Sequence, residues 1–405
     1  MTIELRARTQ AGARLLAIAE DLSGELAART AEHDHAGSYP FEAIDVLKAA
    51  GIFAAPVPAE LGGLGVDSAH DLVVASSRLA RGDASVAIGV NMHLVAVLNM
   101  ERRRRQAVAA GAERRARAFA ASLEQIARDG VVLAAAISEP GQDLTYPRTR
   151  ATRTESGWRI DGRKVFCTMS PAATDLYVAV TYADGDGADR YAYAMVPTGA
   201  PGVVVHDDWD GLGMRASGSN SVSLDGVVLP DSAVRGGFRA GDPLPYIERN
   251  LVSGLFHAAA SLGIAEAADD TARRGLAERV NGDARGRMQV ADNAVDLAAA
   301  RGVLSRAAAL IDEHHAADPA SNGTADELHA LFAEAQAAKI FVNEAAARIV
   351  DRALALSGGA GYINGSSLAR AYRDVRAGSF MHPLGANRAY DYLGRVALGE
   401  DPTLR

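Results

Sequence analysis

The sequence has little cysteine, few aromatic residues and no excess of positive charge, and each shortage excludes a class of protein. Cys167 is the single cysteine of 405 residues, which excludes an internal disulfide framework and indicates a reducing compartment. The net charge of −8 argues against nucleic acid or an anionic membrane as the main partner. No apolar run approaches membrane-spanning length, and the N-terminal MTIELRARTQ has no signal-peptide core, so we expect a cytoplasmic protein.

Hydrophobic residues make up 48% of the chain although only 5% is aromatic, and alanine is frequent. Small side chains let helices approach closely and favour helix formation, so this composition predicts a mostly helical protein. The length leaves room for two or three domains with substantial cores.

Helical spacing dominates the first third of the chain. Apolar residues recur at helical intervals over 9–47 and 68–80, on either side of the proline- and glycine-rich loop 51–65. Residues 84–100 are apolar almost all round, which predicts a buried helix with His93 in its middle. His33 and His35 have no further ligand-type cluster at metal-binding spacing, so we predict no metal site.

The pattern changes to short strands between residues 133 and 230. Two alternating segments, 149–154 and 158–160, meet at Ser156-Gly157 and predict a β-hairpin. Its return arm ends in Phe166 and Thr168, which point to the same side of a strand. Such a face can stack on a planar ring and hydrogen-bond the polar edge of that ring.

Helices return after residue 245, over 247–274, 288–314 and 325–356. The last begins with the capping box Thr324-x-x-Glu327 and stops at Gly358-Gly359. We therefore predict an α+β protein that is mostly α, divided into residues 1–133 (helical), 134–237 (β) and 238–405 (helical bundle).

Three motifs in this order carry a resemblance to a known family. They are Ser138-Glu139-Pro140-Gly141, the Gly-x-Lys-x-aromatic-x-Thr run that ends at Thr168, and Gly-Gly-x-Gly-Tyr from Gly358 followed by Arg373-Asp374. Together they resemble the acyl-CoA dehydrogenase superfamily along nearly the full length. The resemblance implies an N-terminal helical domain, a middle β-barrel domain and a C-terminal four-helix bundle. Relatives are usually tetramers, so a homotetramer is expected by analogy.

The resemblance also implies where a flavin would lie. Ile137 and Ser138 would border its pyrimidine, while Phe166 and Thr168 would cover the isoalloxazine and reach its N5 edge. Gly358 and Gly359 would approach the dinucleotide part of FAD across a subunit interface, and Arg285 or Arg287 would replace the arginine that usually holds the pyrophosphate. FAD is the expected cofactor, with FMN as the alternative.

The catalytic base of the family's dehydrogenases is missing. The glutamate that removes the substrate α-proton would stand within Met381-His382-Pro383-Leu384, which contains no carboxylate. The alternative position of this base in the family falls near Ser253-Gly254, which contains no carboxylate either. We call Ile137, Ser138, Phe166 and Thr168 the flavin wall. A chain that keeps this wall but lacks the base resembles the flavin-dependent monooxygenase branch of the superfamily. Within that branch it most resembles the amino-sugar N-oxygenases, or nitrososynthases, of natural-product biosynthesis.

That branch implies oxidation of the amine of a TDP-linked deoxysugar to a hydroxylamine or nitroso group through a C4a-peroxyflavin. Dioxygen and reduced flavin from a separate reductase would be the co-substrates. The amine must be unprotonated when it reacts, and a histidine could accept its proton, so His382 and His93 are candidate catalytic residues and His257 is a third histidine candidate. Thr168 is the candidate hydroxyl for hydrogen bonding to the flavin or its peroxide. Met381, His382 and Arg215 are the candidate substrate-binding residues, and Arg148 or Arg150 are further candidates for the diphosphate.

Two other readings compete with the N-oxygenase. An acyl-CoA dehydrogenase or oxidase would need an atypical base, for which Glu248 is the nearest carboxylate in the sequence. A helical scaffold that binds no flavin and serves only in protein interaction is the third possibility. Flavin reduction by an acyl-CoA would favour the second reading, and failure to bind flavin would favour the third.

Overall fold

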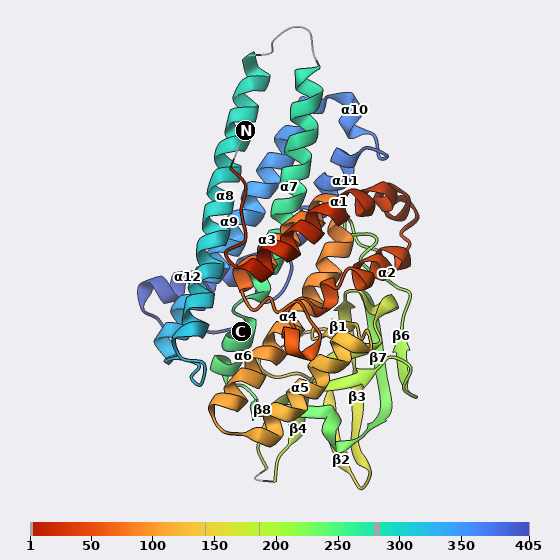
Figure 1. Ribbon diagram of the computed structural model, residues 1–405, viewed down its shortest axis with the longest axis vertical. Helices are drawn as coiled ribbons and strands as arrows, with labels where there is room; N and C mark the ends of the chain where they lie inside the picture. The colour runs from red at the N-terminus through yellow and green to blue at the C-terminus, as the bar shows by residue number, and fades with distance from the viewer. Residues whose placement is uncertain (1–2, 142, 186, 279–283, 405) are drawn as a thin grey trace.

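Helices form both ends of the chain and strands form its middle (Figure 1). The computed structural model describes residues 3–141, 143–185, 187–278 and 284–404. The predicted α+β class is confirmed, and so is the order of the three regions. The N-terminal region consists of α1 (Gln10–Ala36), α2 (Phe41–Ala49), the short 3₁₀ turns η1 (Ile52–Ala54) and η2 (Ala59–Leu61), α3 (Ala69–Gly82), α4 (Ala84–Ala109) and α5 (Glu113–Arg128).

Local chemistry explains where these helices begin. The side chains of Thr9, Ser68 and Asp83 accept hydrogen bonds from backbone N–H groups in the first turns of α1, α3 and α4. The loop 51–65 contains η1 and η2, because its prolines and glycines interrupt a longer helix.

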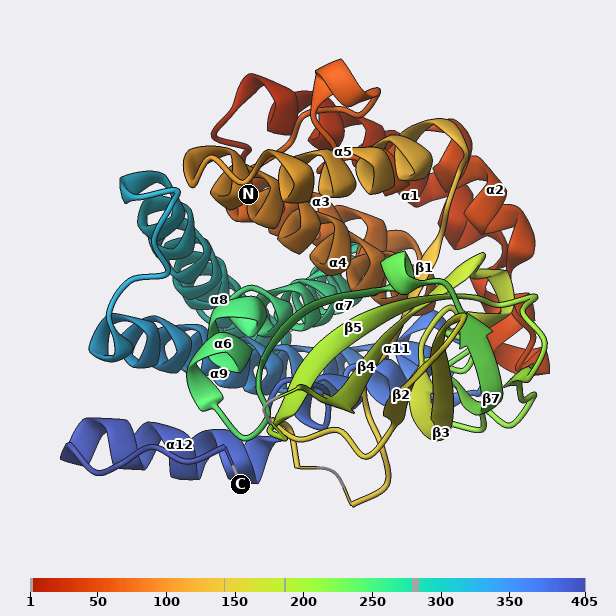
Figure 2. The ribbon, with the colours of Figure 1, turned by 90° about the horizontal axis from the view of Figure 1, so that it is seen from below.

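The strands form one mixed sheet. They are β1 (Leu133–Ala136), β2 (Arg150–Thr154), β3 (Gly157–Cys167), β4 (Asp175–Ala183), β5 (Asp189–Pro197), β6 (Val203–Val205), β7 (Asn220–Leu229) and β8 (Val234–Arg239). The order is β6-β7-β3-β2-β4-β5-β8, and β1 pairs in parallel with β4. The predicted hairpin is present, with Thr154 opposite Gly157. Figure 2 shows how strongly the sheet curls, although no β6–β8 pairing closes it within the described residues.

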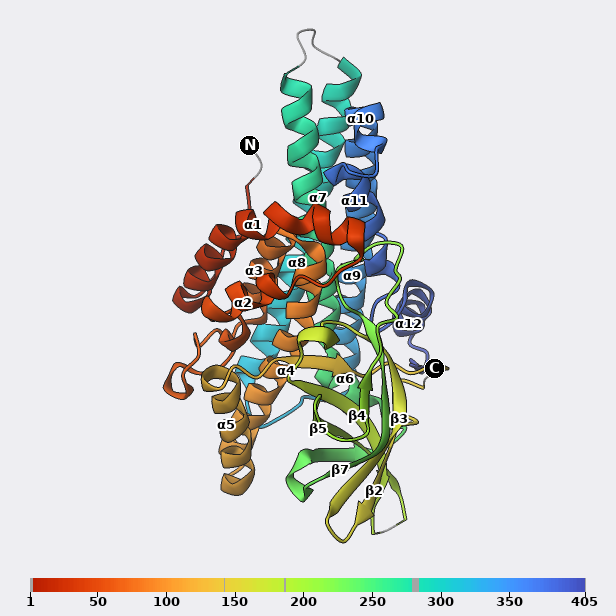
Figure 3. The ribbon, with the colours of Figure 1, turned by 90° about the vertical axis from the view of Figure 1, so that its right-hand side faces the viewer.

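The C-terminal helices extend the molecule along its long axis (Figure 3). They are α6 (Pro243–Asn250), α7 (Ser253–Ala277), α8 (Ala284–Ala317), α9 (Ala325–Ser357), α10 (Gly359–Tyr362), α11 (Ser367–Asp374) and α12 (Ala386–Leu398). The single helix predicted over 247–274 is interrupted between Asn250 and Ser253, where the Ser253 hydroxyl donates to the Asn250 carbonyl at 3.0 Å. This break turns both side chains toward the sheet.

One core joins the two helical regions, and a second core lies under the sheet. A Cβ on Gly263 of α7 would lie 2.3 Å from the Ser77 carbonyl of α3, so only glycine permits this approach. Two segments, α4 and Pro243–Ala277, are long and apolar enough to span a membrane, but 83% and 94% of their apolar windows are buried inside the protein. Burial of this extent is what core helices show.

Candidate active site

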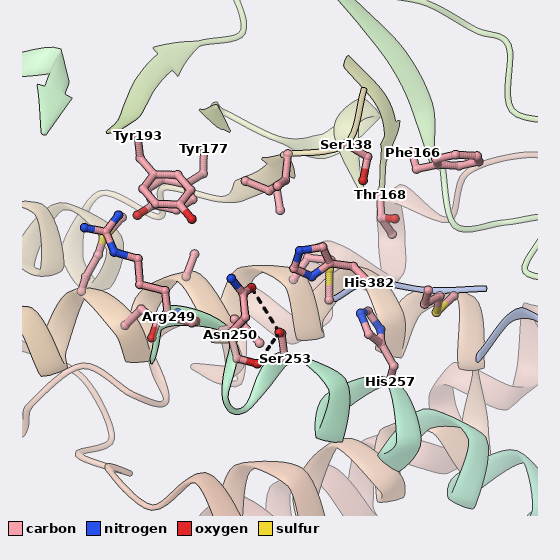
Figure 4. A pocket seen from close by; sticks show the side chains of 18 of the residues that line it. Ser138, Phe166, Thr168, Tyr177, Tyr193, Arg249, Asn250, Ser253, His257 and His382 are labelled. Carbon is pink, nitrogen blue, oxygen red and sulfur yellow. Dashed lines mark hydrogen bonds between the residues drawn. The ribbon is translucent and has the colours of Figure 1, made fainter. Parts of the chain in front are cut away.

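A cavity of about 860 Å³ lies between the sheet and the helices α4, α6 and α7. The segment around Met381 and His382 forms part of its wall, and the Trp209–Met214 loop forms another part. Figure 4 shows Phe166 and Thr168 at one end, Tyr177, Tyr193 and Arg249 at the other, and His382 between them. Its size and mixed lining suit a drug-sized or larger small molecule.

The end near Phe166 combines a flat aromatic with hydroxyl groups. The Phe166 side chain is 64% exposed and meets Trp209 edge-to-face, with ring centroids 6.2 Å apart. The Thr168 hydroxyl lies 2.9 Å from that of Ser219, and the Val165 N–H donates to the Ser138 carbonyl at 3.0 Å, which brings Ile137 and Ser138 beside the strand end. An exposed ring next to apolar and hydroxyl side chains fits an isoalloxazine, so the residues present accommodate a flavin.

A buried ion pair holds this wall in place. The Glu139 carboxylate accepts hydrogen bonds from Lys164 Nζ at 2.6 Å, from the Thr149 hydroxyl at 2.6 Å and from the Arg148 N–H at 2.6 Å. Burial alone would raise the pKa of Glu139, but the Lys164 ammonium and these donors lower it overall. Thus the Glu-Pro-Gly turn and the hairpin are tied together directly behind Ser138.

His382 lies on the cavity wall near its middle. Its Nε2 is 2.8 Å from the Tyr246 hydroxyl, and Lys339 Nζ donates to the Met381 carbonyl and, at 2.7 Å, to that of Leu384. Burial, with the nearby Lys339 ammonium, lowers the pKa of His382 to about 3. The imidazole is therefore neutral at physiological pH.

His257 faces the same cavity from α7 (Figure 4). It is 3% exposed, and within the described residues neither ring nitrogen has a hydrogen-bond partner. Burial lowers its pKa well below the usual value, and Lys339 and His382 add to this effect. A buried polar group without a partner in a cavity is a candidate for contact with a ligand.

The charge of the lining has one sign. Among the described residues, the cavity wall contains no aspartate and no glutamate. It contains seven arginines, which are Arg103, Arg114, Arg115, Arg235, Arg249, Arg373 and Arg376. Such a wall favours an anionic ligand.

His93 is not part of the cavity, and the prediction of a catalytic role is corrected. It is completely buried in α4, where its Nε2 lies 2.8 Å from the Phe53 carbonyl and its Nδ1 accepts from the Leu133 N–H at 3.0 Å. Burial lowers its pKa to about 4. Both nitrogens join backbone segments, so the ring is a structural bridge between η1 and β1.

The arginines proposed for the diphosphate also lie outside the cavity. Arg215 Nε donates to the Asp34 carbonyl at 2.8 Å, and Arg150 pairs with Asp189 at 2.9 Å. Arg148 extends along the outside of the turn to the Pro140 carbonyl at 3.3 Å. None of the three side chains lines the cavity.

Glu248 does not supply the missing base. Its buried carboxylate pairs with Arg102 at 2.8 Å and with Arg103, and it faces a second, small pocket behind α4. An ion pair on the outer side of the wall cannot abstract a proton from a substrate in the main cavity. The dehydrogenase reading therefore has no carboxylate to support it in the part of the chain that the structure describes.

The residues predicted to contact the dinucleotide part of FAD are exposed. They lie toward the end of the bundle away from the sheet, at α10 and the start of α8 (Figure 1), and are Gly358, Gly359, Arg285 and Arg287. One chain does not bring them to the wall formed by Phe166. Within the described residues, no cluster of three or more His, Cys, Asp or Glu side chains is placed to hold a metal ion.

Sequence reasoning missed several residues of the cavity. Tyr177 of β4 and Tyr193 of β5 stack with their ring centroids 4.5 Å apart and 5° between their planes. Tyr177 pairs with Met195, two residues from Tyr193, so the two tyrosines are diagonal neighbours on the sheet. The alternation of side chains along each strand indicates which side of the sheet a tyrosine faces. Only the pairing register of β4 and β5 shows that Tyr177 and Tyr193 are neighbours.

Family models of three domains match the chain. The acyl-CoA dehydrogenase N-terminal domain matches residues 17–103, the middle domain matches residues 134–227 and the C-terminal domain matches residues 247–387. The fold and the flavin-compatible wall agree with these matches. The chain belongs to the acyl-CoA dehydrogenase family.

Within that family the chain is similar over nearly its whole length to amino sugar nitrososynthases. It is 35% identical to the amino sugar nitrososynthase DnmZ of Streptomyces peucetius, covering 97% of this chain and 95% of that protein. It is 36% identical to the L-evernosamine nitrososynthase of Micromonospora sp., covering 97% and 92%. The crystal structure of KijD3 with FMN and dTDP-3-amino-2,3,6-trideoxy-4-keto-3-methyl-D-glucose superposes with a TM-score of 0.89 at 32% identity, covering 98% of this chain and 96% of that one. The predicted branch is thereby confirmed.

Proposed function

We propose that this protein is a flavin-dependent N-oxygenase that converts the amine of a TDP-linked amino deoxysugar to a hydroxylamine and then to a nitroso group. The observation that carries the proposal is the cavity itself, which joins a flavin-compatible wall to a lining of seven arginines without a described carboxylate. The nitrososynthase relatives and the dTDP-sugar bound by KijD3 support the same substrate class.

A cationic lining explains two requirements of this reaction. The arginines can neutralise a diphosphate, which carries at least two negative charges at neutral pH. A protonated amine, in contrast, finds no carboxylate partner among the described residues of the cavity wall. The site therefore binds the amine in its neutral form, whose lone pair is available for oxidation.

His382 and Thr168 are the residues proposed to touch the reacting groups. The neutral His382 imidazole accepts or donates one hydrogen bond to the amine and orients it, while Met381 packs beside it. Thr168 hydrogen-bonds the flavin edge, next to Ile137, Ser138 and Phe166. When bound, the reduced flavin activates dioxygen and supplies the oxygen atom. Apolar side chains such as Ile88 and Met92 keep water from this part of the cavity.

Atoms and electrons balance in each round. The amine nitrogen gains one atom of O₂, and the other atom leaves as water with two electrons and two protons from the reduced flavin. A second round, followed by loss of water, converts the hydroxylamine to the nitroso group. A separate cytoplasmic reductase is the proposed source of reduced flavin, because the described sheet lacks the strand–turn–helix unit that binds nicotinamide dinucleotides.

FAD is the proposed flavin, and a homotetramer is the proposed assembly. Gly358 and Gly359 support both, since they are exposed, and a Cβ added to either would meet no atom within 4 Å. Open backbone of this kind can approach the dinucleotide of a flavin held by a second copy. FMN, which KijD3 holds, is the alternative.

The test supplies photoreduced or enzymatically reduced flavin, air and a TDP-amino deoxysugar to the purified protein. We expect oxygen consumption and a product mass higher by one oxygen atom after the first round. An acyl-CoA is the matched comparison. Reduction of the flavin by the acyl-CoA, with no change in the mass of the amino sugar, would show that the proposed function is wrong.

A further inference from the structure

We propose that the Tyr177–Tyr193–Arg249 end of the cavity binds the nucleoside diphosphate of the substrate, with the Arg249 guanidinium on the phosphates and the tyrosine pair beside the base. This assignment rests on the proposed function, because it names the part of the site that holds the non-reacting end of the same substrate. It replaces Arg215, the arginine that the sequence indicated.

Arg249 is the arginine of this end whose donors are free. It lies at the end of α6 with its guanidinium carbon 5.0 Å from the Tyr193 ring centroid and 4.9 Å from that of Phe238. Within the described residues, no hydrogen bond or salt bridge occupies its guanidinium, and its Nε is buried without a partner. A planar donor fork held against aromatic rings is pre-organised for a phosphate group.

The other arginines of this end add charge but already have partners. Arg103 pairs with Glu248 and also donates to Gln106 at 2.8 Å, and Arg235 donates to the Ser122 hydroxyl and, at 3.1 Å, to the Ser232 carbonyl. Burial raises the pKa of the Tyr177 hydroxyl overall, and both of these guanidinium groups, like that of Arg249, act on it electrostatically in the opposite direction. The local field therefore attracts an anion, and Arg249 has donors left to bind it.

Position along the cavity agrees with the proposed reaction. Figure 4 shows His382, Asn250 and Ser253 between the tyrosines and the Phe166–Thr168 wall. A nucleotide at the tyrosine end places the sugar between Asn250 and His382, and the amine then faces the flavin wall. A nucleotide at the opposite end would instead occupy the flavin wall.

The experiment measures binding of thymidine, TMP and TDP by calorimetry to the flavin-loaded wild type and to Arg249→Met, Arg249→Lys, Arg376→Met and Arg274→Met. We expect Arg249→Met to weaken TDP binding about 10- to 100-fold and thymidine binding less than about 3-fold. Arg249→Lys keeps the charge but loses the fork, so an intermediate loss for TDP is expected. Arg274→Met, a change of the same type at an exposed side chain of α7 outside the cavity, leaves all three affinities as in the wild type.

Several outcomes would overturn the assignment. Equal loss for thymidine and TDP would mean that Arg249 acts only by packing against Tyr193. Loss of TDP binding in Arg376→Met but not in Arg249→Met would place the diphosphate elsewhere in the cavity, because Arg376 is another arginine of its lining. If wild type binds TDP and oxidises the amine while Arg249→Met behaves identically, this inference fails and the proposed function stands. If wild type neither binds TDP nor oxidises the amine, the proposed function itself fails. Arg249→Lys serves as the test variant should Arg249→Met not fold with bound flavin.

Discussion

Burial decides what the histidines of this protein can do. The pKa of His382 is lowered to about 3 and that of His257 well below its usual range, in each case first by burial. Neither ring takes up a proton between pH 6 and 9, so neither acts as the base that removes a proton from an ammonium. The role proposed for them is to offer hydrogen bonds from neutral rings, which leaves proton removal to the equilibrium of the substrate amine in solution.

A pH profile of His382→Gln tests this role. We expect kcat/KM of the wild type to rise with pH through the pKa of the substrate amine and to level off above it, because only the free amine is oxidised. His382→Gln should lower kcat about 10- to 100-fold while the rising limb keeps the same apparent pKa. The measurement is product formation with excess reduced flavin from pH 6 to pH 9.5.

Two comparisons make this experiment decisive. A substrate whose amine has a lower pKa should shift the rising limb equally in both proteins. If the limb disappears in His382→Gln, the histidine titrates in the working range and its assigned neutral role is wrong.

At the scale of elements, the link between the Glu-Pro-Gly turn and the hairpin β2–β3 is a single buried pair. Lys164 of β3 is fully buried, donates to Glu139 at 2.6 Å and also to the Ala179 carbonyl of β4 at 2.6 Å. Three segments therefore meet at one ammonium. Ser138 and Ile137, which line the cavity, precede Glu139 directly, so this pair positions the flavin wall.

Removing one partner should loosen the wall. We expect Lys164→Met to lower the free energy of unfolding by about 3–5 kcal/mol at pH 7, since an uncompensated carboxylate stays buried, and to weaken flavin binding. The Glu139 pKa is lowered in the folded state, so the stability from ionised Glu139 is present above its unfolded pKa of about 4.3 and is lost as pH falls through the folded value. Wild type and variant should therefore converge in acid.

Urea unfolding at pH 7 and at pH 3.5, with flavin fluorescence as a second readout, measures both effects. Lys48→Met is the matched control, because Lys48 lies half-buried on α2 away from the cavity. Equal stability of wild type and Lys164→Met at pH 7 would contradict the assigned role of the pair.

At the scale of the whole molecule, the two groups of predicted flavin contacts lie apart. The wall at Phe166 faces the cavity, whereas Gly358 and Gly359 lie on the exposed surface at α10. Tyr362 and Ile363 beside these glycines are 81% and 67% exposed. Exposed apolar side chains next to open backbone are typical of an interface, which agrees with a flavin dinucleotide shared between copies.

Gel filtration with light scattering tests the proposed homotetramer, which should give four times the chain mass of 42.2 kDa. In the proposed tetramer we expect Gly359→Trp to weaken FAD binding about tenfold or more and to leave FMN binding unchanged, because α10 of the second copy is proposed to contact the part of FAD that FMN lacks. Gly275→Trp, on an exposed face of α7, is the control. A monomer that binds FAD and FMN with equal affinity would contradict both the shared site and the assembly.

The sequence by itself determined the elements whose signals are local. The Ser156-Gly157 turn, the Thr324 capping box and the apolar run around His93 were readable because turn chemistry, capping and hydrophobic period act over a few residues. Family motifs added the flavin wall, and Phe166, Thr168, Ser138 and His382 do line one cavity.

Only the tertiary structure decided which polar side chains face that cavity. Arg215 and His93 are bonded to backbone elsewhere, while Arg249, with no distinguishing motif, stands open beside Tyr193. The physical reason is that hydrogen-bond partners and strand register come from segments far apart in the chain. The residue type fixes which hydrogen-bond donors a side chain has, but the tertiary structure determines whether other groups already accept from those donors.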